Sequence, residues 1–126
     1  MSAVAFTPDG RILATGGEEG TAKLWDVQTR REIVTLKGHL RGIRALNISP
    51  DGSRLVTSAG GIESVKLWDV NTQQELITLA SEGVIITSLG FSPDGNKIVG
   101  RSDQGRARIW RAPSRAEIEA AEKNKQ

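Results

Sequence analysis

Apolar residues form short runs that alternate with turn residues along most of the chain. Three of these runs end in the tripeptide Pro-Asp-Gly, and they occupy residues 2–6, 43–48 and 86–91. Proline presets the backbone angle φ, aspartate bonds to nearby backbone and glycine accepts a positive φ, so this tripeptide favours a tight turn. Runs of this length between such turns predict short β-strands.

Further short strands are predicted after each Pro-Asp-Gly turn. The second and third strands of the three groups span residues 11–15, 54–58 and 97–101, and residues 21–25, 64–68 and 106–110. A fourth strand is predicted only twice, at residues 32–36 and 75–79. Because glycine and proline interrupt the chain so often, a solenoid of long helices is excluded and the pattern predicts an all-β fold.

The predicted strands belong to a sequence repeat. The Pro-Asp-Gly turns recur after 42 and 43 residues, and the three tryptophans recur after 43 and 42 residues. A repeat of this length marks a unit that buries its apolar faces only by stacking on its neighbours. The chain is therefore expected to contain three units, at about residues 1–38, 39–81 and 82–111.

Trp-Asp pairs mark the end of the third predicted strand in two of the units, at residues 25–26 and 68–69, and Gly38-His39 precedes the first strand of the second unit. Together with the short strands of each repeat, these motifs resemble the WD-repeat β-propeller family. The resemblance covers about residues 2–111. It implies a partial β-propeller of three four-stranded antiparallel blades, the last blade lacking its outer strand.

The ends of the chain lead to two further expectations. The repeat places Met1 inside a first strand, and in the family the last blade is often completed by an N-terminal strand, so the chain resembles the C-terminal part of a longer propeller. The tail, residues 112–126, has a capping-box pattern at residues 114–117 and places Glu119 four residues before Lys123. These features predict a short exposed helix in the tail.

The resemblance also implies a structural tetrad in each blade, in which a His, a Ser or Thr, an Asp and the Trp are hydrogen-bonded. Blade two keeps three of these by position, whereas blade three has Glu82, Gly100 and Gln104 beside its tryptophan. Each lost partner leaves a buried polar group to be satisfied otherwise, at about 1–3 kcal/mol, so blade two is expected to be the most stable. The implied tetrad residues are His39, Thr57, Trp68, Thr15, Trp25 and Trp110.

Composition and charge narrow the classes of function. The chain has no cysteine, and its single histidine, His39, has no nucleophile or second metal ligand at a sensible spacing. We therefore expect no enzyme activity, no metal and no cofactor. The net charge is only +2. Four arginines lie close together near the C-terminus, namely Arg101, Arg106, Arg108 and Arg111. Neither a basic block nor stacking aromatics accompany them, which argues against a nucleic-acid partner. Without an apolar run that could span a membrane, a cytoplasmic location is expected.

The residues expected to bind a partner lie in loops at one rim of the predicted propeller, because loops on a rigid scaffold carry binding more often than strands do. We expect an interaction module for a protein or peptide, with contact candidates Glu19, Arg41, Arg44 and Asp103. The alternative is a structural fragment that completes a larger propeller and has no binding role of its own. Both outer blades would expose a sheet face, so a homo-oligomer or completion by missing blades is expected.

Overall fold

β-Strands make up the regular structure of the computed structural model, which describes residues 3–17, 19–37, 42–59, 65–79, 86–102 and 104–111. The strands are β1 (Ala3–Phe6), β2 (Ile12–Gly16), β3 (Thr21–Asp26), β4 (Arg31–Lys37), β5 (Ile43–Ile48), β6 (Arg54–Ala59), β7 (Val65–Asp69), β8 (Glu75–Leu79), β9 (Ile86–Phe91), β10 (Lys97–Ser102) and β11 (Ala107–Arg111). Each strand begins and ends within one residue of its predicted bounds, because the glycine and proline turns limit where a strand can extend.

The strands form three antiparallel sheets of consecutive strands. The first sheet has the order β1-β2-β3-β4, the second β5-β6-β7-β8 and the third β11-β10-β9. Two four-stranded units followed by one unit without its outer strand were predicted, and the described residues confirm this. The predicted helix falls on residues 112–126, which lie outside the described residues, and the proposed unit boundaries stay predictions.

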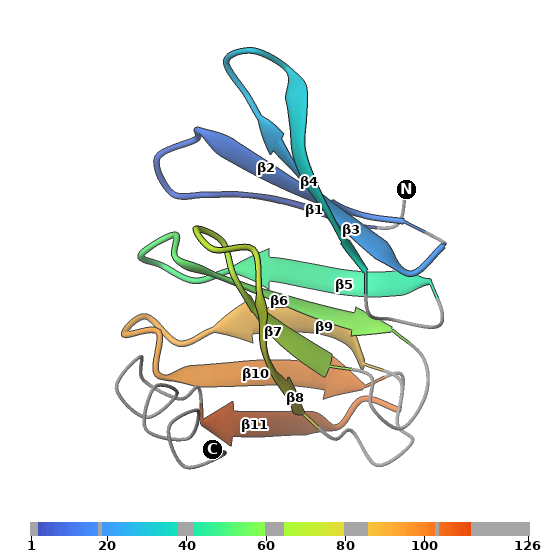
Figure 1. Cartoon of the computed structure of the whole chain (residues 1–126). Coiled ribbons are helices and arrows are strands. Elements are labelled where there is room, and N and C mark those ends of the chain that lie inside the picture. The colour runs from blue at the N-terminus through green and yellow to red at the C-terminus, as the bar shows by residue number, and fades with distance from the viewer. Residues whose placement is uncertain are drawn as a thin grey trace, which may run out of the picture.

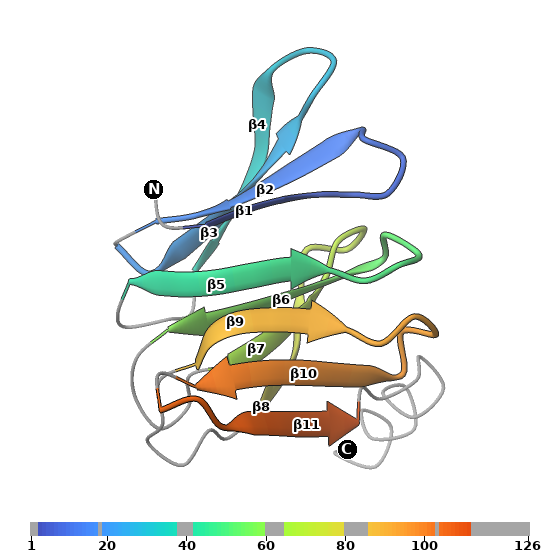
Figure 2. The same cartoon turned by 180° about the vertical axis from the view of Figure 1, so that it is seen from behind.

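The three sheets are stacked on one another in chain order (Figure 1). From behind, the second sheet again lies between the other two, with β1–β4 at one end of the stack and β9–β11 at the other (Figure 2). The first strands of successive sheets contact each other, β1 against β5 and β5 against β9. Each sheet has a front face, which carries its repeat tryptophan, and an opposite rear face, and sheets pack with front against rear.

Apolar side chains fill the spaces between the sheets. Between the first and second sheets, the rear face of one and the front face of the other contribute Ala14, Ala22, Leu24 and Leu36, and Ile43, Leu46, Ile48, Leu55 and Trp68. Between the second and third sheets, the corresponding faces contribute Ala45, Val56, Val65 and Leu67, and Ile86, Leu89 and Ile98. Because side chains alternate between the faces of a strand, the second sheet supplies both clusters, and every residue of β7 is buried.

Hydrogen bonds and one glycine also join neighbouring sheets. At the first boundary the backbone N–H of Ile43 donates to the carbonyl of Gly17 at 2.9 Å. At the second boundary the hydroxyl of Ser58 donates to the carbonyl of Ile86 at 2.9 Å. A Cβ atom at Gly16 would lie 2.8 Å from Cβ of Ile43, so the first two sheets approach closely only because this position has no side chain.

The Pro-Asp-Gly turns are built alike in all three sheets. In the first turn the hydroxyl of Thr7 donates to Oδ1 of Asp9 at 2.6 Å, and the backbone N–H of Arg11 donates to the same oxygen at 3.0 Å. The glycine of this turn, Gly10, has a φ of 74°, and the glycines of the other two turns have 78° and 75°. Side chains disfavour this backbone region, which confirms the predicted role of glycine.

Candidate protein-interaction site

Two of the implied tetrad pairs contact each other directly. Nε1 of Trp68 donates to the hydroxyl of Thr57 at 3.0 Å, and both residues are buried. Nε1 of Trp25 donates to the hydroxyl of Thr15 at 2.9 Å, where both residues are half-buried. His39 lies outside the described residues, so the tetrad as a whole stays a prediction. In both sheets a hydroxyl on the second strand holds the indole ring of the third strand.

The third sheet has Gly100 at the position of this hydroxyl. A Cβ atom at Gly100 would lie 2.8 Å from Cζ3 of Trp110, so the ring covers the glycine and leaves no room for a side chain. Gln104 is exposed in the following turn, where its backbone N–H donates to the hydroxyl of Ser102 at 3.3 Å. Glu82 lies outside the described residues. Packing against Gly100 therefore positions Trp110 in the third sheet.

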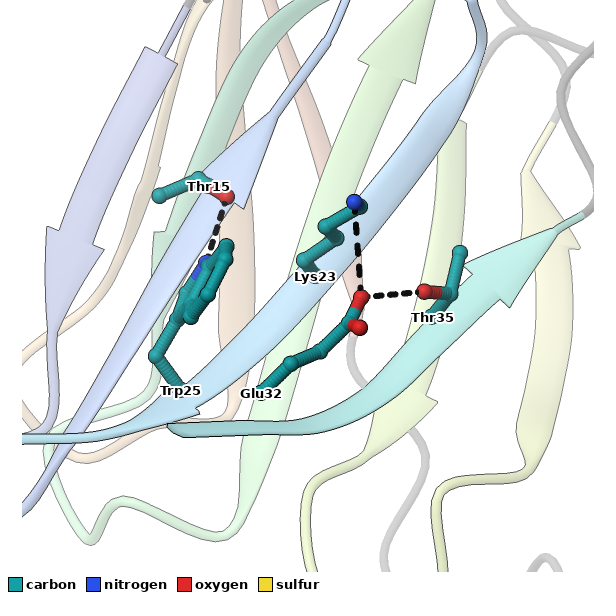
Figure 3. Close-up of polar contacts among 5 residues, drawn as sticks. All are labelled: Thr15, Lys23, Trp25, Glu32 and Thr35. Carbon is teal, nitrogen blue, oxygen red and sulfur yellow. Dashed lines mark hydrogen bonds and ion pairs between the residues drawn. The ribbon is translucent and has the colours of Figure 1, made fainter. Parts of the chain in front are cut away.

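A lysine lies beside Trp25 on the front face of the first sheet (Figure 3). Nζ of Lys23 lies 3.5 Å from Oε1 of Glu32 and 5.9 Å from the centre of the Trp25 ring. The hydroxyl of Thr35 donates to the same oxygen of Glu32 at 2.5 Å. This hydrogen bond, and after it the positive charge of Lys23, lower the pKa of Glu32 below its usual value. The cluster joins β3 to β4.

The second sheet repeats this cluster at equivalent positions. Nζ of Lys66 donates to the hydroxyl of Thr78 at 3.0 Å and forms an ion pair with Glu75. The side chain of Lys66 is only 10% exposed, against 43% for its counterpart, because the first sheet packs on this front face. Sequence reasoning missed the cluster, although residues 32–36 and 75–79 share the pattern Glu-aliphatic-aliphatic-Thr-Leu.

An open hollow of about 480 Å³ lies on the front face of the first sheet, beside the Lys23 cluster. Its lining consists of Thr15, Gly16, Gly17, Glu19, Thr21, Lys23 and Trp25. The size is that of a ligand pocket, roughly 300–1,000 Å³, but such pockets are mostly apolar and enclose their ligand. This hollow offers a carboxylate, an ammonium group, an indole ring and hydroxyls. That mixture suits contacts with a polypeptide better than the burial of an apolar small molecule.

The predicted contact residues fall in different parts of the molecule. Glu19 is exposed in the turn before β3 and lines the hollow. Arg44 is exposed on β5 of the second sheet, at the point where the pairing of β5 with β6 shifts register. No hydrogen bond or ion pair joins these two described residues. Arg41 and Asp103 lie outside the described residues, so the proposed rim stays a prediction.

The front face of the first sheet exposes apolar side chains at positions whose equivalents in the second sheet are buried. Val4 and Phe6 of β1 are 53% and 58% exposed. Leu46 and Ile48, at the equivalent positions of β5, are each 7% exposed, because the first sheet covers them. This front face therefore has the composition of a packing surface without a described sheet against it.

The rear face of the third sheet shows the same contrast at the other end of the stack. Val99 and Ile109 are 38% and 67% exposed. Val56 and Leu67, at the equivalent positions of the second sheet, are completely buried. Exposed apolar patches of this kind on a folded chain mark interaction surfaces. The stack thus presents one surface at each end.

The four arginines near the C-terminus do not share one surface. Strand alternation places Arg101 and Arg111 on the rear face of the third sheet and Arg108 on its front face, while Arg106 precedes β11. A nucleic-acid surface requires basic groups along one face, and for single strands aromatic side chains between them. The rear face carries two of these arginines, but β10 and β11 place no aromatic side chain between them. This favours the expectation against a nucleic-acid partner, which stays a prediction.

In the described part of the chain, no three His, Cys, Asp or Glu side chains lie close enough together to hold a metal ion. The same residues include no helix that is long and apolar enough to cross a membrane. The expectations of no enzyme activity and no cofactor stay predictions.

Comparison with known protein families places the repeats. The family described as WD domain, G-beta repeat matches residues 1–26, 30–69 and 73–111. The chain therefore belongs to the WD40 repeat family, as its sequence motifs predicted. WD40 repeats are in general protein-interaction scaffolds rather than catalysts.

Three relatives illustrate the likeness. The chain is 38% identical over 58 residues to pre-mRNA-processing factor 19 of Oryza sativa subsp. japonica, which covers 46% of the chain and 11% of the relative. It is 43% identical over 54 residues to WD repeat and SOCS box-containing protein 1 of Mus musculus, covering 43% and 13%. It is 38% identical over 47 residues to the general transcriptional corepressor TUP1 of Saccharomyces cerevisiae, covering 37% and 7%. The matched part is thus a small share of each relative.

The sequence repeats and the sheets are out of phase. The second matched stretch, residues 30–69, contains β4 of the first sheet and β5–β7 of the second. The third stretch, residues 73–111, likewise contains β8 of the second sheet and β9–β11 of the third. Each complete repeat therefore spans two sheets, and the chain itself ties neighbouring sheets together.

Proposed function

We propose that the chain is a non-catalytic protein-interaction module that binds a protein or peptide through the hollow on the front face of the first sheet. The observation that carries this proposal is the grouping of Glu19, Lys23 and Trp25 around one open hollow. Tryptophan is enriched among the residues that dominate binding energies at protein interfaces. Because the hollow holds one carboxylate and one ammonium group, it suits a partner segment that carries both charges or a polar backbone.

The other expected contact residues extend this proposal. We propose Arg41, Arg44 and Asp103 as further contact residues outside the lining of the hollow. Charges at the rim of an interface govern the rate of association more than the affinity. We also propose a cytoplasmic location for the protein. Imaging of a fluorescent fusion in cells tests the location, and a signal confined to another compartment would contradict it.

Site-specific photo-crosslinking tests the hollow as the binding site. A benzophenone amino acid at Glu19 is expected to crosslink a partner protein in cells, whereas the same group at Gln28, an exposed turn position outside the hollow, is not. With the purified partner, Lys23→Glu is expected to weaken binding about tenfold, which corresponds to about 1.4 kcal/mol. Equal crosslinking from both positions would contradict the proposal.

A second candidate function is completion of a larger propeller, and the exposure of Val4 and Phe6 favours it. In this case a further sheet, from a second copy or from a longer polypeptide, covers the front face of the first sheet. Light scattering on the chain tests the second-copy form. A dimer or larger assembly that dissociates in the variant Val4→Glu/Phe6→Glu would support it, and a monodisperse monomer of the unchanged chain would contradict it.

A further inference from the structure

The rear face of the third sheet combines an aliphatic centre with a positively charged border. Val99 and Ile109 lie directly opposite each other on β10 and β11. Lys97 and Arg101 are the next residues of β10 on this face, one on either side of Val99, and Arg111 lies opposite Lys97. All five side chains are exposed. No acidic side chain of β10 or β11 lies on this face.

The border distinguishes this surface from the rear faces of the other two sheets. Arg101 takes the position of Gly16 in the first sheet and of Ser58 in the second. Those two small residues lie against the first strand of the next sheet, where even a Cβ atom at Gly16 would approach Ile43 too closely. An arginine at this position does not fit against a sheet like the second or third. The rear face of the third sheet is therefore suited to a different partner.

We propose that this face binds an extended acidic segment of a partner protein, in which one aliphatic residue lies between two carboxylate residues. The aliphatic side chain packs on Val99 and Ile109, and the carboxylates pair with Lys97 and Arg101. These two cations lie two residues from Val99, which corresponds to about 6.6 Å along a strand. The spacing matches an extended segment with the order acidic, any, aliphatic, any, acidic, because alternate side chains share one face.

A polypeptide fits this surface better than a nucleic acid does. The centre of the face is aliphatic, whereas surfaces for single-stranded nucleic acid stack bases on aromatic rings. The only tryptophan of the third sheet, Trp110, lies on the opposite face and is packed over Gly100. The surface also lies at the other end of the stack from the hollow of the first sheet, so this inference is independent of the proposed function.

Fluorescence anisotropy with a defined probe tests the inference on the full chain. The probe is a fluorescein-labelled heptapeptide that has glutamates two residues before and two residues after a central isoleucine, with glycine and serine elsewhere. Binding is expected to weaken about fivefold in each of Arg101→Glu and Lys97→Glu, which is the scale of an exposed ion pair and its reversal. Ile109→Ser is expected to weaken it as well. The matched control is Arg31→Glu, an exposed strand arginine of the first sheet, which should bind as the unchanged chain does.

A variant with reversed charges distinguishes the loss of the binding site from misfolding of the chain. The variant Lys97→Glu/Arg101→Glu should bind the heptapeptide with lysines in place of glutamates more tightly than the unchanged chain does. The proposal is overturned by equal binding of both peptides to the unchanged chain, or by equal losses in Arg31→Glu and Arg101→Glu. It is also overturned if an oligothymidylate binds with the same dependence on Arg101. If Glu117→Gln/Glu119→Gln raises probe affinity tenfold, the chain's own tail covers the face and a partner segment is excluded.

Discussion

Hydroxyl groups on the residues before the Pro-Asp-Gly turns form the side-chain hydrogen bonds that hold these turns together. Ser49 donates to Oδ1 of Asp51 at 2.6 Å and accepts the backbone N–H of Arg54 at 3.0 Å, and Thr7 and Ser92 make the equivalent contacts. The Asp side chain and the turn were predictable from the sequence. The hydroxyl was not, because a Ser or Thr before proline has no distinct pattern of its own. The hydrogen bonds from these hydroxyls lower the pKa of the aspartate in each turn.

Asp51 makes the stability of the fold depend on pH. The hydroxyl of Ser49, followed by the backbone N–H and hydroxyl of Ser53, lowers the pKa of Asp51 to about 2. An unfolded aspartate titrates near about 3.9. A lowered folded pKa contributes stability that is complete above the unfolded pKa and is lost as the pH falls from about 5 to about 2. Urea unfolding over this range should show a steeper loss for the unchanged chain than for Asp51→Asn. Parallel pH profiles would contradict the role of Asp51.

The two Thr–Trp pairs should differ in their contribution to stability. Thr57→Val keeps the shape of the side chain but leaves buried Nε1 of Trp68 without its hydroxyl acceptor, at an expected cost of about 1–3 kcal/mol. Thr15→Val should cost less, because the half-buried Trp25 can bond to water instead. Urea denaturation followed by tryptophan fluorescence measures both. A larger effect of Thr15→Val would contradict the greater contribution expected from the buried pair of Thr57 and Trp68.

At the scale of strands, the outer strand of each complete sheet is held by a repeated polar cluster. Lys23 with Glu32, and Lys66 with Glu75, join the third and fourth strands on the front face. Packing against the preceding sheet buries Lys66 of the second cluster, whereas Glu75 stays 41% exposed. Periodicity predicted the strands themselves, but it could not predict the clusters, because their lysines are covered or exposed according to how sheets stack rather than by local sequence.

Removal of the carboxylate should affect the stability of the protein differently in the two clusters. Glu75→Gln leaves the ammonium group of Lys66, whose side chain is 10% exposed, without its ionic partner, and we expect a loss of about 1–2 kcal/mol. Glu32→Gln should have a smaller effect, since Lys23 remains accessible to water. Thermal unfolding of the two variants measures the difference. If both variants melt at the same temperature, the burial of Lys66 has no energetic consequence.

At the scale of the whole molecule, the stacking of three similar sheets accounts for both the core and the exposed end faces. The family and the division of the described strands into two sheets of four and one of three were predictable, because turn residues and tryptophans keep one period. The difference between the two end faces was not predictable from the sequence. It depends on single residues, above all Arg101 in place of Gly16 and Ser58, whose significance appears only once the neighbouring sheet shows how little space that position allows.

The packing of front face against rear face is the central claim, and a double-mutant cycle at the first boundary tests it most directly. Gly16→Ala alone should cost about 1–3 kcal/mol through overpacking against Ile43. In the background of Ile43→Ala that cost should fall, because the contact with Cγ2 of Ile43 is removed and only the contact with its Cβ remains. The expected coupling energy is about 1 kcal/mol or more. Gly90→Ala, where a Cβ atom would meet nothing within 4 Å, serves as the control and should add independently to Ile43→Ala. Additive effects of Gly16→Ala and Ile43→Ala, within about 0.5 kcal/mol, would contradict the stacked arrangement of the first two sheets.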